Sequence, residues 1–364
     1  MPIQWATPLL DGEEEKEIID SLRANWISMG PKVKAFEAFF SKFIGVKHAI
    51  AVSSGTAALD VALKALKVAP GDEVIVPALT YIATVNAVMY QHARPVLVDV
   101  SMDDINLDAD KIQEKITKRT KVIMPIDYGG NSADYAKLEK LAKDSGAFLL
   151  EDGAHSIGGT FNGKSLCSFG SMATASFHTA KVITSVEGGM VFTDSDDLGT
   201  LSRIIRNQGE DPAKKYFHPI VGHNYRMSDI HAGVGLAQTR KLDRILSARA
   251  NVAEMYNKRL GHMDGIVLPK VRKGCKCAWF LYPVMFKTKE VRDKIVDSLK
   301  KGGVETRICW PYPIHTQGAY QGLFKGEKYP NSEYIADRNV TLPMHPGLTE
   351  KDVDYIANII DGII

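Results

Sequence analysis

A lysine near the middle of the chain lies in a setting that suits covalent chemistry. Lys181 ends the segment SFHTAK and lies between two strand-like stretches, MATASF and MVFTD. Its neighbours are neutral and largely apolar. Burial lowers the pKa of an amine and favours a nucleophilic amine or a Schiff base. The competing interpretation is a solvated surface lysine, which is the commoner environment of this residue type.

Two other segments carry groups that could serve the same site. Asp152 follows the apolar run FLLE, and a carboxylate at the end of a strand could hold a protonated heterocyclic nitrogen. Residues 53–56, Ser-Ser-Gly-Thr, lie where a strand passes into a helix. Free backbone N–H groups and the helix dipole favour an anion there. Ordinary helix caps are the alternative for both segments.

A third polar cluster precedes a long helical stretch. Asn224, Tyr225 and Arg226 are consecutive, and together they could grip a phosphate or a carboxylate. A plain helix start with Ser228 as its cap is the alternative. With the lysine, the aspartate and the anion-binding turn, the cluster completes the parts needed to bind a phosphorylated pyridine cofactor.

The sequence pattern predicts the strands and helices that must position these groups. Strand-like and helix-like segments alternate over about the first 240 residues. The predicted strands are 48–52, 73–77, 95–100, 121–125 and 147–151, and the predicted helices are 56–67, 81–91 and 133–145. Continuous apolar strands separated by helices indicate an α/β fold whose mostly parallel sheet is covered on both faces. Such sheets place their sites at the carboxyl ends of strands.

The regular alternation of strands and helices ends in the last third of the chain. Residues 227–260 are helical, as one long helix or two joined ones. Beyond them we expect a strand at 279–286, a helix at 291–301, a turn plus strand at 302–306 and a closing helix at 353–360. The sequence thus predicts a large domain, 1–245, and a small C-terminal α+β domain, 246–364. The N-terminal segment is a candidate to pack on the small domain.

Composition narrows the functional classes. The chain has 364 residues, 45 Lys plus Arg and 43 Asp plus Glu, so its formal net charge of +2 gives no case for binding nucleic acid or a membrane surface. No apolar run reaches the roughly 18 residues that a spanning helix needs. The N-terminus turns acidic where a signal peptide would turn apolar, so we expect a cytoplasmic protein. Cys275 and Cys277 lack a second pair at zinc spacing, and we expect no metal.

The chain resembles the DegT/DnrJ/StrS family of pyridoxal-phosphate-dependent sugar aminotransferases, which have fold type I. The resemblance covers at least residues 30–260. The matching stretches are SSGTAALDVALKAL, PGDEVIVPALTYIATVNAV, RPVLVDV, KVIMPIDYGG, FLLEDGAHSIGG, SFGSMATASFHTAKVITSVEGGMVFTD and GHNYRMSDIHAGVGLAQ. It implies a large domain with a mostly parallel sheet flanked by helices, a smaller C-terminal α+β domain, and pyridoxal 5'-phosphate as the cofactor.

The resemblance assigns roles to the residues that match the motifs. It implies that Lys181 is the Schiff-base lysine and the catalytic base. Asp152 matches the carboxylate that pairs with the pyridinium nitrogen and makes the ring an electron sink. Gly55 and Thr56 match the phosphate-binding turn, which Ser176 joins from the strand before the lysine.

Further positions belong to the rim of the implied site. Tyr81 matches the aromatic residue that stacks on the ring. Asn224 matches a residue donated to the phosphate across a homodimer, so the resemblance implies shared active sites. His155 stands where many relatives carry Gln or Glu, and it contacts either the ring's phenolic oxygen or the substrate. Arg226 is a candidate for a substrate anion.

Two more histidines are candidates for substrate contacts. His178 lies in the lysine segment itself. His315 follows an aromatic segment, residues 307–314, that could line the pocket of a sugar nucleotide. A packed, proline-rich loop is the alternative for that segment, and also for His345.

The resemblance also implies a reaction. Residues 176–189 resemble the branch that aminates carbon 4 of nucleotide-linked 4-keto-6-deoxy sugars, as perosamine synthases do. L-glutamate would supply the amino group in a ping-pong exchange and leave as 2-oxoglutarate, in amino-sugar biosynthesis for lipopolysaccharide or O-antigen. The alternatives are amination at carbon 3, dehydration of the sugar, or a regulatory relative that binds ligand without turnover. Lys181 argues against dehydration, because the dehydratases carry His there.

Overall fold

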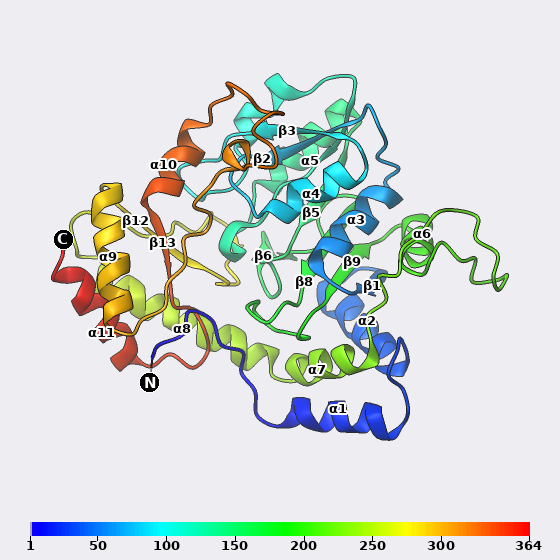
Figure 1. Cartoon of the computed structure of the whole chain (residues 1–364), viewed down its shortest axis with the longest axis horizontal. Helices are drawn as coiled ribbons and strands as arrows, with labels where there is room; N and C mark the ends of the chain where they lie inside the picture. Colours follow the sequence, from blue (N-terminus) through cyan, green and yellow to red (C-terminus); the bar gives the residue numbers. More distant parts are fainter. Residues whose placement is uncertain (1) are drawn as a thin grey trace.

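The computed structural model describes residues 2–364, and a seven-stranded sheet lies at its centre (Figure 1). From one edge to the other the strands are β1 (His48–Val52), β9 (Gly189–Thr193), β8 (Met172–Ser176), β5 (Phe148–Asp152), β4 (Thr120–Ile123), β2 (Glu73–Pro77) and β3 (Arg94–Val98). Only β9 runs against its neighbours. The predicted α/β fold with a mostly parallel sheet is therefore confirmed.

Helices cover both faces of this sheet. The helices of residues 2–364, including those that pack elsewhere, are α1 (Glu13–Arg23), α2 (Pro31–Ile44), α3 (Gly55–Ala65), α4 (Ile82–Tyr90), α5 (Tyr135–Ser145), α6 (Asp196–Arg206), α7 (Asp229–Thr239), α8 (Leu242–Leu260), α9 (Lys289–Lys301), α10 (Pro330–Arg338) and α11 (Glu350–Asp361). Alternate residues of a strand point to opposite faces. Ile50 and Val52 thus pack with α3 and α4, whereas Ala49 and Ala51 pack with α2.

A smaller unit follows the large sheet along the chain. Its sheet has the order β10 (Ile266–Val267), β12 (Tyr282–Phe286), β13 (Asn339–Leu342), and α9, α11 and the second half of α8 pack on it. A third sheet, β11 (Cys275–Lys276), β6 (Thr160–Phe161), β7 (Lys164–Ser165), lies beside α5. Figure 1 shows α9, α11, β12 and β13 together at one end of the molecule.

Residues 227–260 form two joined helices, which is one of the two predicted alternatives, separated only by Arg240 and Lys241. Two details differ from the sequence prediction. The strand predicted at 279–286 begins at Tyr282. The strand predicted at 302–306 is wrong, because Val304 makes only an isolated bridge, to Ile3 of the N-terminal segment. α8 runs through residue 245 without a break, so the domain boundary there stays a prediction.

None of the helices in residues 2–364 has the length and apolar character that crossing a bilayer would require.

An aromatic cluster joins α2 to the strands that carry the site. The Phe40 ring is fully buried, and its centroid lies 5.0 Å from those of Phe36 and Phe177 and 6.3 Å from that of Phe192. Phe177 directly follows β8, so this cluster supports the segment that leads to Lys181.

We expect Phe40→Ala to lower the free energy of unfolding by about 3–5 kcal/mol, because it removes a large buried ring and leaves a cavity. Phe43→Ala is the matched control, since Phe43 lies on the same helix and is only partly buried. Denaturant unfolding of both variants measures the difference. Equal losses in the two variants would contradict the supporting role of the cluster.

Candidate active site

One cavity, of about 440 Å³, lies at the carboxyl ends of β5 and β8 and at the start of α3. It brings together most of the predicted site residues, which come from segments far apart in the sequence: Gly55, Thr56, Tyr81, Asp152, His155, Ser176, His178 and Lys181. Trp5, Thr84, Glu187, Phe280 and Trp310 complete its walls. The rule that parallel sheets place sites at strand ends holds for this chain.

Lys181 lies in the loop that joins β8 to β9. Its Nζ is 4.3 Å from the centroid of the Phe280 ring, so the amine lies over an aromatic face. Burial lowers the pKa of Lys181 to about 8, and the nearby Asp152 carboxylate opposes that shift. The amine therefore loses its proton close to neutral pH, as a nucleophile or a general base must.

Asp152 ends β5 and is fully buried in the floor of the cavity. Its carboxylate accepts hydrogen bonds from the Thr84 hydroxyl at 2.8 Å and from the Ala154 N–H at 3.3 Å. Burial raises the pKa of Asp152, and the Thr84 hydrogen bond opposes that change. A buried carboxylate needs a positive partner. The geometry suits a protonated ring nitrogen in the cavity.

The start of α3 forms the anion-binding end of the cavity. The Ser54 hydroxyl accepts a hydrogen bond from the Ala57 N–H, so it caps the helix. A Cβ added at Gly55 would lie 2.8 Å from the Cβ of Ser176, so a larger residue would force the helix away from β8. The absence of a side chain at Gly55 keeps the helix N-terminus and the Ser176 hydroxyl within reach of one anion.

His155 is buried beside the lysine, with its ring centroid 4.4 Å from that of Phe280. Burial lowers the pKa of His155 well below its ordinary value, so the ring is neutral. The Gly129 N–H donates to Nδ1 at 3.3 Å. The proton of the neutral ring is therefore on Nε2, which makes His155 a hydrogen-bond donor through that atom.

Aromatic and polar residues form the mouth of the cavity. The Tyr81 ring is 53% exposed and its centroid lies 5.1 Å from that of Trp310. His178 and Glu187 lie across from each other, with 3.8 Å between Nε2 and Oε1. Trp310 belongs to the aromatic segment 307–314 that the sequence singled out, and this residue of the segment lines the cavity.

Three predicted site residues lie elsewhere in the single chain. Asn224 is exposed and makes a backbone bridge with Asn207. The Arg226 guanidinium donates to the Asn207 side-chain oxygen at 2.8 Å. His315 is bonded to Glu333 at 3.1 Å and packs on Tyr329. None of these three side chains lines the cavity.

The sequence missed the residues that shape the floor and the walls. Thr84 could have been noticed from its spacing alone, because it lies in the first turn of α4 and follows Thr80 by four residues. The two hydroxyl oxygens are 2.8 Å apart. Phe280 and Trp5 come from segments nearly 100 and more than 170 residues away from Lys181 and carry no motif. Only the folded chain brings them to the lysine.

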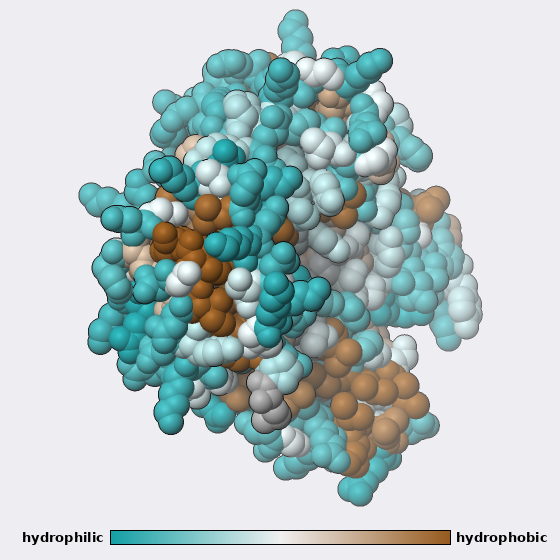
Figure 2. Space-filling model, turned by 60° about the vertical axis from the view of Figure 1, so that its left-hand side comes forward, coloured by the Kyte–Doolittle hydropathy of each residue, from teal (hydrophilic) through white to brown (hydrophobic). Residues whose placement is uncertain are grey.

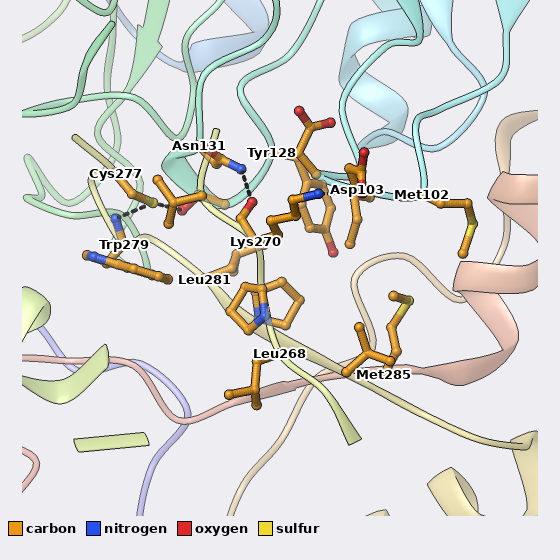
Figure 3. A pocket seen from close by; sticks show the side chains of 17 residues that line it. Met102, Asp103, Tyr128, Asn131, Leu268, Lys270, Cys277, Trp279, Leu281 and Met285 are labelled. Carbon is orange, nitrogen blue, oxygen red and sulfur yellow. Dashed lines mark hydrogen bonds and ion pairs between the residues drawn. The ribbon is translucent and has the colours of Figure 1, made fainter. Parts of the chain in front are cut away.

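A second cavity, of about 190 Å³, lies beyond the turn that contains Tyr128 and Gly129. Figure 3 shows Tyr128, Trp279 and Leu281 around it, with Asp103 and Lys270 at its edge. These two charged groups pair with each other at 2.9 Å. Burial raises the pKa of the Cys277 thiol, which keeps it protonated. This cavity therefore offers no activated nucleophile, unlike the one that contains Lys181.

The residues of the first cavity fit pyridoxal phosphate. Asp152 suits its ring nitrogen, Lys181 its aldehyde, and the helix start at Gly55 its phosphate. The position of Gly55, where a Cβ would fill the space beside Ser176, is the structural observation that makes room for this phosphate.

We expect acylation of Lys181 by acetic anhydride to increase with pH around a midpoint of about 8 in protein freed of cofactor, because burial lowers the pKa of this amine to about 8. Exposed lysines react with a midpoint of about 10.4. Peptide mass spectrometry across a pH series measures both groups in one sample. A Lys181 midpoint equal to that of the exposed lysines would show that the amine is hydrated.

Comparisons with known proteins agree with this geometry. A family model described as the DegT/DnrJ/EryC1/StrS aminotransferase family matches residues 8–361. GDP-perosamine synthase from Caulobacter vibrioides is 39% identical over 366 residues, which cover 100% of this chain and 98% of the relative. GDP-perosamine synthase from Vibrio cholerae is 36% identical over 355 residues, covering 97% of this chain and 96% of the relative.

Solved structures are similar over the whole chain. The pyridoxal-phosphate form of a putative sugar aminotransferase, Spr1654 from Streptococcus pneumoniae, superposes with a TM-score of 0.93 at 28% identity, covering 100% of this chain and 98% of that one. DesV from S. venezuelae superposes with a TM-score of 0.92 at 31% identity, covering 98% of each chain. The chain belongs to the DegT/DnrJ/EryC1/StrS aminotransferase family, and it is a pyridoxal-phosphate-dependent sugar aminotransferase of fold type I.

Proposed function

We propose that the protein transfers the amino group of L-glutamate to carbon 4 of a nucleotide-linked 4-keto-6-deoxyhexose. The products are a 4-amino-4,6-dideoxy sugar nucleotide and 2-oxoglutarate. The observation that carries the proposal is the Lys181 amine, held over Phe280 and near Asp152 in one cavity. The similarity to two GDP-perosamine synthases supports the sugar class and the carbon atom.

The proposed cofactor contacts follow from the positions of the side chains. Asp152 would pair with the ring nitrogen, and Tyr81 at the mouth would stack on the ring. Thr56, Ser176 and the N–H groups at the start of α3 would bind the phosphate. When bound, pyridoxal phosphate withdraws electrons from the carbon atom that gives up its proton, which makes that proton acidic.

Lys181 is the proposed proton carrier. Its Nζ would take up the proton that leaves the amine-bearing carbon and would release it again toward the bound cofactor. It suits this role because the cavity already holds Nζ beside the reacting groups. A pKa of about 8 lets Nζ both gain and lose a proton near neutral pH. Neutral His155 would donate a hydrogen bond from Nε2 to an oxygen of the bound cofactor or substrate, and its lack of charge avoids repulsion of the Lys181 ammonium.

The proposed substrate enters between Tyr81, Trp310 and His178, which lie at the mouth of the cavity. His178 can reach a substrate from there. We assign no substrate contact to His315, because its Nε2 pairs with the Glu333 carboxylate and its side chain is buried. Retention of a lysine at position 181 supports amino transfer over dehydration of the sugar.

A homodimer with shared sites is part of the proposal. The segment between α6 and α7, which projects from the molecule in Figure 1, exposes Tyr216 at 78% and Val221 at 77%. Figure 2 shows further hydrophobic surface at the lower edge of the molecule, at the height of α1. The exposed apolar residues of α1 are Ile19 and Leu22, and Trp26 and Ile27 follow it. Exposed apolar residues that gather in this way commonly mark a protein–protein interface.

Shared sites would also explain the position of Asn224. It lies outside the cavity of its own chain, on the segment between α6 and α7. In a homodimer with shared sites it would reach the cavity of the second copy. Arg226, which follows on the same segment, is then the candidate for a substrate anion in that second cavity. A cytoplasmic setting completes the proposal, because the four cysteines are free thiols, as is typical of a reducing compartment.

The reaction is tested by adding L-glutamate and then a panel of GDP-, dTDP- and UDP-linked 4-keto-6-deoxyhexoses, with GDP first because of the perosamine relatives. We expect an amine product by mass spectrometry, with nitrogen on carbon 4 by NMR, and no product from Lys181→Ala. Nitrogen on carbon 3 would overturn the carbon assignment. A dehydrated product, or turnover by Lys181→Ala, would overturn the role of the lysine.

Shared sites are tested by mixing Lys181→Ala with Asn224→Ala at limiting pyridoxal phosphate. If Asn224 serves the other subunit, each mixed dimer has one cavity with both natural residues. We therefore expect mixed dimers to regain about half of the natural activity per dimer, by the one-in-two count of intact cavities. No gain over the separate variants, at a confirmed dimer mass, would show that Asn224 does not act across the interface.

A further inference from the structure

We infer that Arg249 is a positioning residue of the active site. Its guanidinium fixes the backbone of Lys181 relative to the segments that carry Phe280 and Trp5. The inference rests on the proposed role of Lys181. No sequence motif points to Arg249, which lies in the middle of α8, and its side chain does not line the cavity.

The guanidinium donates hydrogen bonds to three carbonyl oxygens. Nη1 donates to Met344 at 2.9 Å and to Trp279 at 3.1 Å, and Nη2 donates to Lys181 at 3.4 Å. All three carbonyls lie outside helices and strands, so no ladder of backbone hydrogen bonds fixes them. A planar group with several donors in fixed directions can join such segments, whereas a lysine has one freely rotating ammonium.

Each of these carbonyls belongs to a segment that carries a wall of the cavity. Trp279 precedes Phe280, whose ring lies under the Lys181 amine. The Met344 N–H donates to the Trp5 carbonyl at 3.0 Å, and the Trp5 ring contacts Phe280 edge-on at 6.3 Å. The third carbonyl is that of Lys181 itself. One side chain thus fixes the lysine relative to the aromatic rings around its amine.

The environment of Arg249 indicates that its guanidinium has a function beyond stabilising the fold. Its side chain is 1% exposed, and no carboxylate within residues 2–364 pairs with it. Burial lowers the pKa of the guanidinium to about 10. Burial and the Arg249 charge both lower the pKa of His345, and the contact with Lys181 is made to its backbone carbonyl. An uncompensated buried cation destabilises a fold, and an apolar side chain of similar volume would avoid that penalty.

Arg292 provides a matched control. It is also buried, at 4% exposure, and its Nη1 donates to the carbonyls of Ala336 at 3.3 Å and Asn339 at 3.1 Å. It lies on α9 in the smaller unit, and its contacts carry no wall of the cavity. Its Nε also pairs with the Asp293 carboxylate at 2.6 Å. Arg292→Met therefore removes a buried guanidinium that binds backbone carbonyls, without disturbing the lysine.

The experiment compares Arg249→Met, Arg249→Lys and Arg292→Met with the natural protein. We expect both methionine variants to fold, which thermal unfolding checks. Only Arg249→Met should lower kcat, by about 10- to 100-fold, the effect of a small misplacement of reacting groups. KM for glutamate should change less than kcat. In protein freed of cofactor, the midpoint for acetic anhydride labelling of Lys181 should rise in Arg249→Met, because the loosened amine gains water and burial is what lowers its pKa. Arg249→Lys should recover part of both properties.

Equal kcat and an unchanged labelling midpoint in Arg249→Met and Arg292→Met would overturn the inference. If Arg249→Met does not fold, Arg249→Lys is compared with Arg292→Lys by the same two readouts, and equality again overturns it. A natural protein whose Lys181 labels like an exposed lysine, or an active Lys181→Ala, would instead overturn the proposed function. The two failures are therefore distinguishable.

Discussion

The enclosure of the Lys181 amine is the constraint on which the rest of the active site depends. An ammonium group loses favourable hydration when it leaves water, so burial makes its neutral form accessible near pH 8. Phe280 and Asp152 partly offset that loss, because the ring face and the carboxylate both attract the charged form. The balance between burial and attraction gives an amine that changes its protonation state within the range where enzymes work.

The sheet supplies this enclosure through close contacts at one edge. β5 carries Asp152 to the cavity floor, and β8 brings Ser176 to the start of α3. Gly189, the first residue of β9, has no Cβ because the Ser54 carbonyl occupies that space. The start of α3, the end of β8 and the start of β9 can therefore meet around the lysine loop only while Gly55 and Gly189 remain glycines.

The sequence predicted the parts of this site that depend on local order. The strands were recognisable as continuous apolar runs, and Asp152 and Lys181 followed two of them. Phe280, Trp5 and Arg249 escaped prediction because their importance arises from contacts with residues far away in the sequence, and nothing near them marks it. The strand expected at 302–306 failed for a related reason, since Val304 finds only the short N-terminal segment as a partner.

The antiparallel course of β9 has a consequence for how this family can diversify. Ser176 and Gly189 are direct partners in the ladder, so the loop of residues 177–188 leaves and re-enters the sheet at one place. A crossover helix would instead tie such a loop to a distant strand. Both ends of the loop that carries Lys181 therefore lie side by side on the sheet. The length and side chains of this loop can be exchanged by recombination or by design while the order of the strands stays the same.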